Sequence, residues 1–229
     1  MLWMMPRRTV LLLVAFLSLL GCRTSGTEAK ADPPAGGHTT AAAVRRNVGT
    51  DPGGAAAGTP LKARPGNELA AFAAGCFWGV EDNFRQVPGV VATAVGYTGG
   101  KTKAPTYESV CDHGTGHAET VLVEYEPAKV SYDDLLRVFF LNHDPTTKNR
   151  QGPDVGDQYR SAVFALDETQ EQAAKAAADA ATKRLGKPVA TEITRLGAFW
   201  KAEGYHQQYD EKTGTHSCPT PRGLKTTDS

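Results

Sequence analysis

The chain has 229 residues and carries 25 basic and 25 acidic side chains, so its formal net charge at pH 7 is zero. A neutral chain without a basic stripe gives no support to nucleic-acid binding, and we expect no nucleic-acid partner. We find no internal repeat. The part of the chain that follows a leader and a linker, residues 67–229, is long enough for one domain with a sizeable core.

Residues 1–21 have the pattern of an export signal peptide. Two arginines precede an apolar stretch over residues 10–20, which is too short to predict a membrane-spanning helix. The tetrapeptide Leu-Leu-Gly-Cys that ends at Cys22 resembles a bacterial lipoprotein processing site, at which Cys22 becomes the lipidated N-terminus. Leu20 departs from the more usual small residue, so ordinary secretion is the alternative. We expect an exported, membrane-anchored lipoprotein that faces the periplasm or the cell surface.

The composition of residues 22–66 predicts a flexible linker that follows the lipid anchor in the sequence. Ala, Gly, Thr and Pro dominate the segment, and no helical or strand period is present. Such a composition cannot bury enough apolar surface to offset the entropy lost on ordering. We therefore expect this segment to be disordered and to act as a tether for the domain at residues 67–229.

A strand, a turn and a helix open the domain around Cys76. The apolar run over residues 69–74 predicts a buried strand, and an amphipathic helical pattern begins just after Gly75 and Cys76. Unpaired backbone N–H groups and the positive end of the helix dipole favour a thiolate at such a position. The alternative is a small buried core residue, since cysteine is often found in protein cores.

Further strands and helices alternate loosely along the domain. Alternating apolar patterns and β-rich runs predict strands over residues 90–97, 119–125, 159–166 and 190–196. Helices are predicted from a capping box at Ser131, from Asp167 to Gly186, and over residues 201–210, before a mobile C-terminal tail. This order fits an α+β two-layer sandwich.

Seven short motifs follow one another along residues 75–209. They are GCFWG (75–79), GYTGG (96–100), PTYESVC (105–111), GHAET (116–120), NHDPT (142–146), DQYRS (157–161) and YHQQY (205–209). Together they resemble the A-type peptide methionine sulfoxide reductases over roughly residues 67–218. The resemblance implies a mixed, largely antiparallel sheet flanked by helices, and reduction of free and peptide-bound methionine S-sulfoxide in the repair of oxidised proteins. Repair of the R epimer is not expected, because each epimer has its own enzyme.

Glu119 is the expected proton donor. It shares strand parity with Val121 and Val123, which predicts that it points into the apolar face, where desolvation raises the pKa of a carboxyl and keeps it protonated. From this segment alone, a frayed strand end that turns Glu119 to solvent is the alternative. The resemblance implies that Glu119 protonates the sulfoxide oxygen while the Cys76 thiolate attacks sulfur and becomes a sulfenic acid.

The resemblance also assigns residues that hold the substrate. Tyr107 and Tyr159 correspond to two active-site tyrosines, whose phenols can hydrogen-bond the sulfoxide oxygen while their rings are buried. Phe77 and Trp78 are expected to form an apolar wall that receives the substrate methyl group.

Asp154 and His206 complete the expected substrate site. Asp154 corresponds to an aspartate that binds the substrate backbone, although a proline precedes it here, and His206 is expected to line the pocket. Histidines and carboxylates such as His113, His117 and Glu119 also raise the possibility of a metal site. No Cys-x-x-Cys pair is present, and we expect no metal and no bound cofactor.

Three cysteines remain in the domain once Cys22 is set aside, namely Cys76, Cys111 and Cys218. An odd number in an exported protein favours at least one thiol outside a structural disulfide. The resemblance implies that Cys218 resolves the sulfenic acid on Cys76 as a disulfide, which an external thioredoxin-like dithiol then reduces. Cys111 is expected to follow a strand or turn and to serve only in packing.

The expected partners are oxidised proteins and peptides, the thioredoxin-like reductant and, through the lipid anchor, a membrane. We expect a monomer.

Two other classes of function fit parts of the sequence. A cysteine hydrolase or acyltransferase would combine Cys76 with His117 or His206 and with Glu119. A binding lipoprotein would use the aromatic pocket alone and would tolerate Cys76→Ser. Reductant-dependent conversion of a methionine sulfoxide peptide separates both from a reductase.

Overall fold

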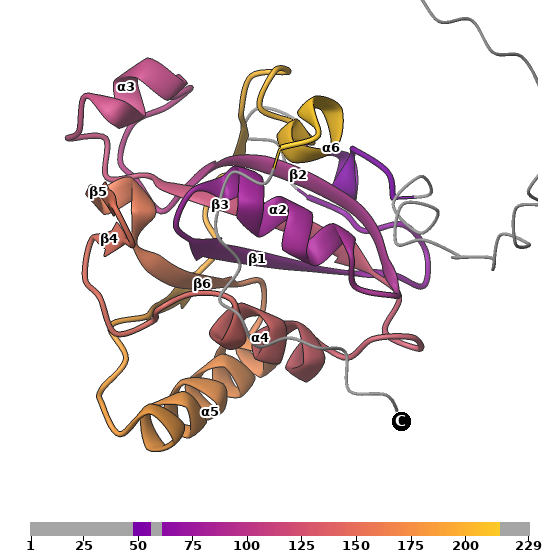
Figure 1. The fold of residues 1–229 in the computed structure, drawn as a ribbon. Coiled ribbons are helices and arrows are strands. Elements are labelled where there is room, and N and C mark those ends of the chain that lie inside the picture. Colours follow the sequence, from indigo (N-terminus) through magenta and orange to yellow (C-terminus); the bar gives the residue numbers. More distant parts are fainter. Residues whose placement is uncertain (1–47, 56–60, 216–229) are drawn as a thin grey trace, which may run out of the picture. The chain divides into compact units, whose positions relative to one another are not determined.

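The computed structural model describes residues 48–55 and 61–215. Its main sheet has six strands in the order β7-β6-β1-β3-β2-β8, and every neighbouring pair is antiparallel except β6 with β7 (Figure 1). The strands are β1 (Glu68–Ala74), β2 (Val90–Thr98), β3 (Ala118–Tyr125), β6 (Ser161–Ala165), β7 (Glu192–Arg195) and β8 (Trp200–Lys201). The predicted α+β fold with a mixed, largely antiparallel sheet is confirmed.

Helices and a small hairpin surround this sheet. The helices are α2 (Phe77–Arg85), α3 (Tyr107–Cys111), α4 (Tyr132–Leu141), α5 (Glu168–Leu185) and α6 (Tyr209–Thr213), and the hairpin pairs β4 (Arg150–Gln151) with β5 (Asp154–Val155). The predicted caps are present: Ser131 forms a capping box, and the Asp167 side chain accepts the N–H of Gln170. Gly186 ends α5 in the left-handed conformation, with φ of 64°.

The main core lies between the sheet and the helices α2, α4 and α5. Phe72 at the centre of β1 stacks on Phe84 of α2 and on Phe139 of α4, with ring centroids 4.9 and 5.4 Å apart. The alternation of β3 buries Val121 and Val123 in the same core. Since apolar surface buried at this face drives the packing of α2, the core also sets where the first turn of that helix lies.

Parts of the predicted linker pack on the domain, namely residues 48–55 and 61–66, of which Arg64 donates its N–H to Glu124 Oε1 at 3.0 Å. Residues 48–55 were expected within the disordered linker, but Gly49 pairs with Ala92 of β2, and the Gly53 N–H donates to Glu124 Oε2 at 2.8 Å. The prediction of disorder is wrong for these residues because it considered only apolar burial. The folded sheet supplies hydrogen-bond partners, including the buried Glu124 carboxylate, that composition does not reveal.

Three local predictions are also corrected. The strand predicted from residue 159 begins at Ser161, because Asp157–Tyr159 form a short 3₁₀ helix, η2. The segment that contains Cys111 is the helix α3 rather than a strand or turn. Residues 201–210 do not form one helix; Gln207 bonds both the N–H and the C=O of Val95 in β2, and Gln208 has a left-handed φ of 52°. These long-range hydrogen bonds outweigh the local helical preference.

Part of the sequence prediction lies outside the described residues. This applies to the signal peptide over residues 1–21, to Cys22, to most of the linker and to Cys218. Within residues 48–55 and 61–215, no helix combines the length and the apolar character needed to cross a membrane.

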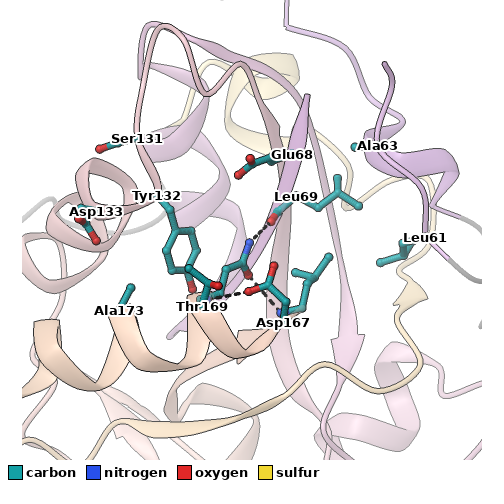
Figure 2. A pocket seen from close by; sticks show the side chains of 12 residues that line it. Leu61, Ala63, Glu68, Leu69, Ser131, Tyr132, Asp133, Asp167, Thr169 and Ala173 are labelled. Carbon is teal, nitrogen blue, oxygen red and sulfur yellow. Dashed lines mark hydrogen bonds between the residues drawn. The ribbon is translucent and has the colours of Figure 1, made fainter. Parts of the chain in front are cut away.

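A cavity of about 600 Å³ lies at the start of β1, beside α4 and α5. Figure 2 shows Glu68, Leu69, Tyr132 and Asp167 around it, and a hydrogen bond of 2.7 Å from Gln170 Nε2 to the Leu69 carbonyl crosses it. None of the predicted site residues lines this cavity. It lies at the end of β1 opposite to Cys76, so this cavity is not the predicted active site.

His143 predicts a loss of stability at acid pH. Its Nδ1 donates to the Phe139 carbonyl at 2.7 Å, its Nε2 accepts from Ser161 Oγ at 2.7 Å, and burial lowers its pKa to about 4. Below pH 6.5 the unfolded chain therefore binds a proton that the folded chain does not. The free energy of unfolding should fall as the pH drops from about 6.5 towards 4, by roughly 3 kcal/mol in total from this residue.

Urea unfolding at several pH values between 4.5 and 7 measures this slope. His143→Gln should flatten it. A slope in His143→Gln equal to that of the wild type would contradict the assignment to His143.

Candidate active site

Cys76 lies at the turn between β1 and α2, as predicted. Gly75 has φ of 101°, and a Cβ atom there would lie 2.7 Å from Gln151 Cγ, so only glycine fits between the strand and the β4–β5 hairpin. Cys76 then occupies the N-cap position of α2 and is half-buried. The first N–H groups of the helix and its positive dipole end stabilise negative charge at this point, which favours the thiolate.

Glu119 lies beside the same turn. Its side chain is buried at the start of β3, and its Oε2 accepts the N–H of Phe77 at 3.0 Å. The alternative of a side chain turned to solvent at a frayed strand end is therefore wrong. Because Phe77 directly follows Cys76, this hydrogen bond holds a carboxyl next to the cysteine.

Tyr107 and Tyr159 meet near these two residues, one at the start of α3 and the other at the end of η2. Burial raises the pKa of both phenols, and the nearby charges of Glu119 and Cys76 raise them further. The cysteine, the carboxyl and the two phenols therefore lie in one neighbourhood, near enough to influence one another electrostatically. Both phenols are protonated at neutral pH and can donate hydrogen bonds.

An aromatic wall adjoins the cysteine. Phe77 and Trp78 both pack against His206, with ring centroids 5.1 and 5.5 Å apart. Trp78 Nε1 donates to His206 Nδ1 at 3.0 Å, and the indole stacks on Tyr209 at 3.8 Å. Burial lowers the pKa of His206, which keeps the ring neutral. Sequence analysis did not single out Tyr209, although its place in the YHQQY motif was a signal.

Glu203 is a second residue that sequence analysis missed. Its carboxylate accepts the Tyr107 N–H at 2.8 Å and the Tyr97 hydroxyl at 3.0 Å. It precedes the YHQQY motif in an irregular segment, where neither periodicity nor a motif marked it. It connects α3 with strand β2.

The hairpin β4–β5 brings Asp154 to this end of the sheet. Asp154 pairs with Gln151, and the Gln151 side chain packs against Gly75. Gly152, in the turn of the hairpin, has φ of 55°. The proline before Asp154 lies in this turn, so it does not interrupt the pairing of the two strands.

Cys111 is closer to the site than predicted. It lies at the end of α3, one helical turn after Tyr107, and its thiol interacts with the phenol of that residue. Burial raises the pKa of the Cys111 thiol, and the charge of Glu119 adds to this effect. Cys111 thus lies beside a residue of the site and carries a thiol that stays protonated, and its expected role in packing stays a prediction.

His117 and His206, the two histidines that a hydrolase would use, make hydrogen bonds to other groups. His117 is buried, with Nδ1 accepting the Gly100 N–H at 3.2 Å and Nε2 contacting the Thr102 carbonyl at 2.8 Å. His206 Nδ1 is engaged by Trp78. A hydrolase triad is thus not supported.

In the described part of the chain, no cluster of three His, Cys, Asp or Glu side chains is arranged to bind a metal ion.

Comparison with known proteins gives one consistent family. Residues 68–229 match the family model described as peptide methionine sulfoxide reductase. Proteins named peptide methionine sulfoxide reductase MsrA from Geobacter metallireducens and Methanosarcina acetivorans are 56% and 58% identical over 156 and 151 residues. The matches cover 67% and 65% of this chain and 96% and 80% of those relatives.

Solved structures agree with this result. Methionine sulfoxide reductase A of Corynebacterium diphtheriae is similar with a TM-score of 0.65 and 36% identity, over 76% of this chain and 90% of that one. The reduced form of Mxr1 from Saccharomyces cerevisiae has a TM-score of 0.65 and 35% identity, over 68% of this chain and 92% of that one.

Proposed function

Because the chain belongs to the peptide methionine sulfoxide reductase family, we propose that it reduces free and peptide-bound methionine S-sulfoxide to methionine and so repairs oxidised proteins. The observation that carries the proposal is the hydrogen bond from the Phe77 N–H to Glu119, which joins a cysteine at a helix N-terminus to a buried carboxyl. The protonated phenols of Tyr107 and Tyr159 beside them add donors for an oxygen atom.

The reductive step uses these groups together. The Cys76 thiolate attacks the sulfoxide sulfur, while Glu119 gives a proton to the sulfoxide oxygen and Tyr107 and Tyr159 donate hydrogen bonds to it. The hydroxyl then moves from the substrate sulfur to Cys76 Sγ: a sulfur–oxygen bond forms at Cys76, while the sulfur–oxygen bond of the substrate and the transient sulfur–sulfur bond break. Methionine leaves, and Cys76 is a sulfenic acid. The sulfur of the substrate is thus reduced by two electrons and that of Cys76 is oxidised by two.

The aromatic wall explains the selection of the substrate. The methyl group of methionine sulfoxide is apolar and fits against Phe77 and Trp78, whose rings are backed by His206. Asp154, in the hairpin beside Gly75, is proposed to bind the backbone of a peptide substrate.

Recycling is proposed to use Cys218. Its thiol attacks the sulfenic acid on Cys76, water leaves, and a disulfide between the two cysteines forms. An external thioredoxin-like dithiol then reduces this disulfide by exchange, so no bound cofactor is needed. For the intact protein, we propose export, lipidation at Cys22 and tethering of a monomeric domain to a membrane.

Glu119→Gln is the direct test of the reductive step. The amide cannot protonate the oxygen, so single-turnover reduction of a methionine sulfoxide peptide should slow by about 10² to 10⁴ while the fold is kept. Cys76→Ser serves as the control and should form no methionine. Wild-type rates in Glu119→Gln would move the acid role elsewhere, and methionine formation by Cys76→Ser would exclude the proposed nucleophile.

Cys218→Ser tests the recycling step. This variant should form one equivalent of methionine per enzyme and then stop, because the sulfenic acid cannot become a disulfide that thioredoxin reduces. Cys111→Ser, which keeps a hydroxyl for Tyr107, should turn over at nearly the wild-type rate. Peptide mapping of the oxidised enzyme decides the pairing, and a dominant bridge from Cys76 to Cys111 would show that Cys218 is not the resolving thiol.

Cys22→Ala tests the anchor. In a bacterial host given a fatty-acid analogue, the wild-type chain should be labelled and the variant should not. Label retained by Cys22→Ala, or missing from the wild type while a control lipoprotein is labelled, would favour ordinary secretion.

A further inference from the structure

Glu203 lies where two walls of the proposed site meet. Its Oε1 accepts the backbone N–H of Tyr107 at 2.8 Å, and its Oε2 accepts the hydroxyl of Tyr97 at 3.0 Å. The same Oε2 lies 3.9 Å from His206 Nε2. Tyr107 belongs to the side that would hold the sulfoxide oxygen, and His206 to the side that would receive the methyl group. Tyr97, fully buried in β2, connects both to the sheet.

Glu203 is ionised at neutral pH. Burial alone would raise the pKa of this carboxyl, but hydrogen bonds from the Tyr107 N–H, its own backbone N–H and the Tyr97 hydroxyl lower it below the usual value. Its side chain is 33% exposed. The negative charge of Glu203 therefore lies beside the buried ring of His206 and remains partly in contact with water.

This charge selects the tautomer of His206. Because Nδ1 accepts the Trp78 N–H, the neutral ring has to carry its proton on Nε2. Nε2 is buried, and the described residues offer it no hydrogen-bond partner; the Glu203 carboxylate is the charge it faces. The attraction between the Nε2 proton and this carboxylate favours the tautomer that leaves Nδ1 available to Trp78. The orientation of the indole thus depends on Glu203 through His206.

We propose that Glu203 is a positioning residue, which holds the oxygen-binding Tyr107 and the methyl-binding wall of Trp78 and His206 in one geometry. This inference rests on the proposed function. Glu203 itself would touch neither the substrate nor Cys76 in this role. Its loss should misplace Tyr107 at the start of α3 and allow the His206 ring to change tautomer.

Glu203→Gln in the full-length protein is the main test, with Glu211→Gln as a matched control. Glu211 has a similar exposure of 32% and pairs with Arg85 at 2.6 Å. The single-turnover rate of sulfoxide reduction should fall by about 10 to 100-fold in Glu203→Gln, the usual effect of displacing a group by about 1 Å. Glu211→Gln should keep the wild-type rate.

Nitrogen NMR of histidine-labelled protein gives a readout that simple destabilisation would not change. The wild type should show His206 protonated on Nε2, whereas Glu203→Gln should shift it towards the Nδ1-protonated form. Glu203→Asp, which keeps the charge on a shorter arm, should retain the wild-type tautomer with an intermediate rate. If Glu203→Gln does not fold, the single-turnover rate and the His206 tautomer can both be measured in Glu203→Asp.

An unchanged reductive rate, an unchanged His206 tautomer, or an equal loss of rate in Glu211→Gln would overturn the proposal. If the wild type failed to reduce the sulfoxide, the proposed function would be wrong. Even then, the NMR measurement on Glu203→Gln would show whether Glu203 determines which nitrogen of His206 carries the proton.

Discussion

The hydrogen bond from the Phe77 N–H to Glu119 Oε2 is the constraint on which the proposed site depends. It ties the first turn of α2 to the start of β3, and so fixes a cysteine that can carry negative charge beside a carboxyl that can carry a proton. Both partners are buried, and both elements belong to the same hydrophobic core. A shift of α2 against the sheet would therefore cost core packing as well as this hydrogen bond.

Carboxylates extend the same principle to segments without regular structure. Several backbone N–H groups of irregular segments or helix starts donate to side-chain carboxyl groups from distant parts of the chain. Examples are Gly53 with Glu124, Gln208 with Glu81, and Tyr107 with Glu203. Each of these bonds satisfies a backbone donor that has no partner in a sheet or helix. In this way the irregular segments and the start of α3 are fixed to the sheet and to α2 by hydrogen bonds.

The electrostatics of the site suit a reaction that begins with a thiolate and needs protons. Tyr107 and Tyr159 stay neutral because burial and the neighbouring negative charges raise their pKa values. The phenols of Tyr107 and Tyr159 therefore act as neutral hydrogen-bond donors near Cys76 and Glu119, and they add no negative charge to the site. Cys111, whose pKa is also raised, remains a thiol and a neutral partner for Tyr107.

The sequence by itself determined the elements that depend on neighbouring residues. Apolar periodicity located β1 and β3, and caps located α4 and α5, because these signals act over a few residues. Cys76 and Glu119 followed from the same local patterns and from motif order. The packing of residues 48–55, the contacts of Glu203 and the irregular path of residues 201–210 were decided only in the tertiary structure. Their hydrogen-bond partners lie far away in the chain, and no local pattern specifies which donor will meet which carboxylate.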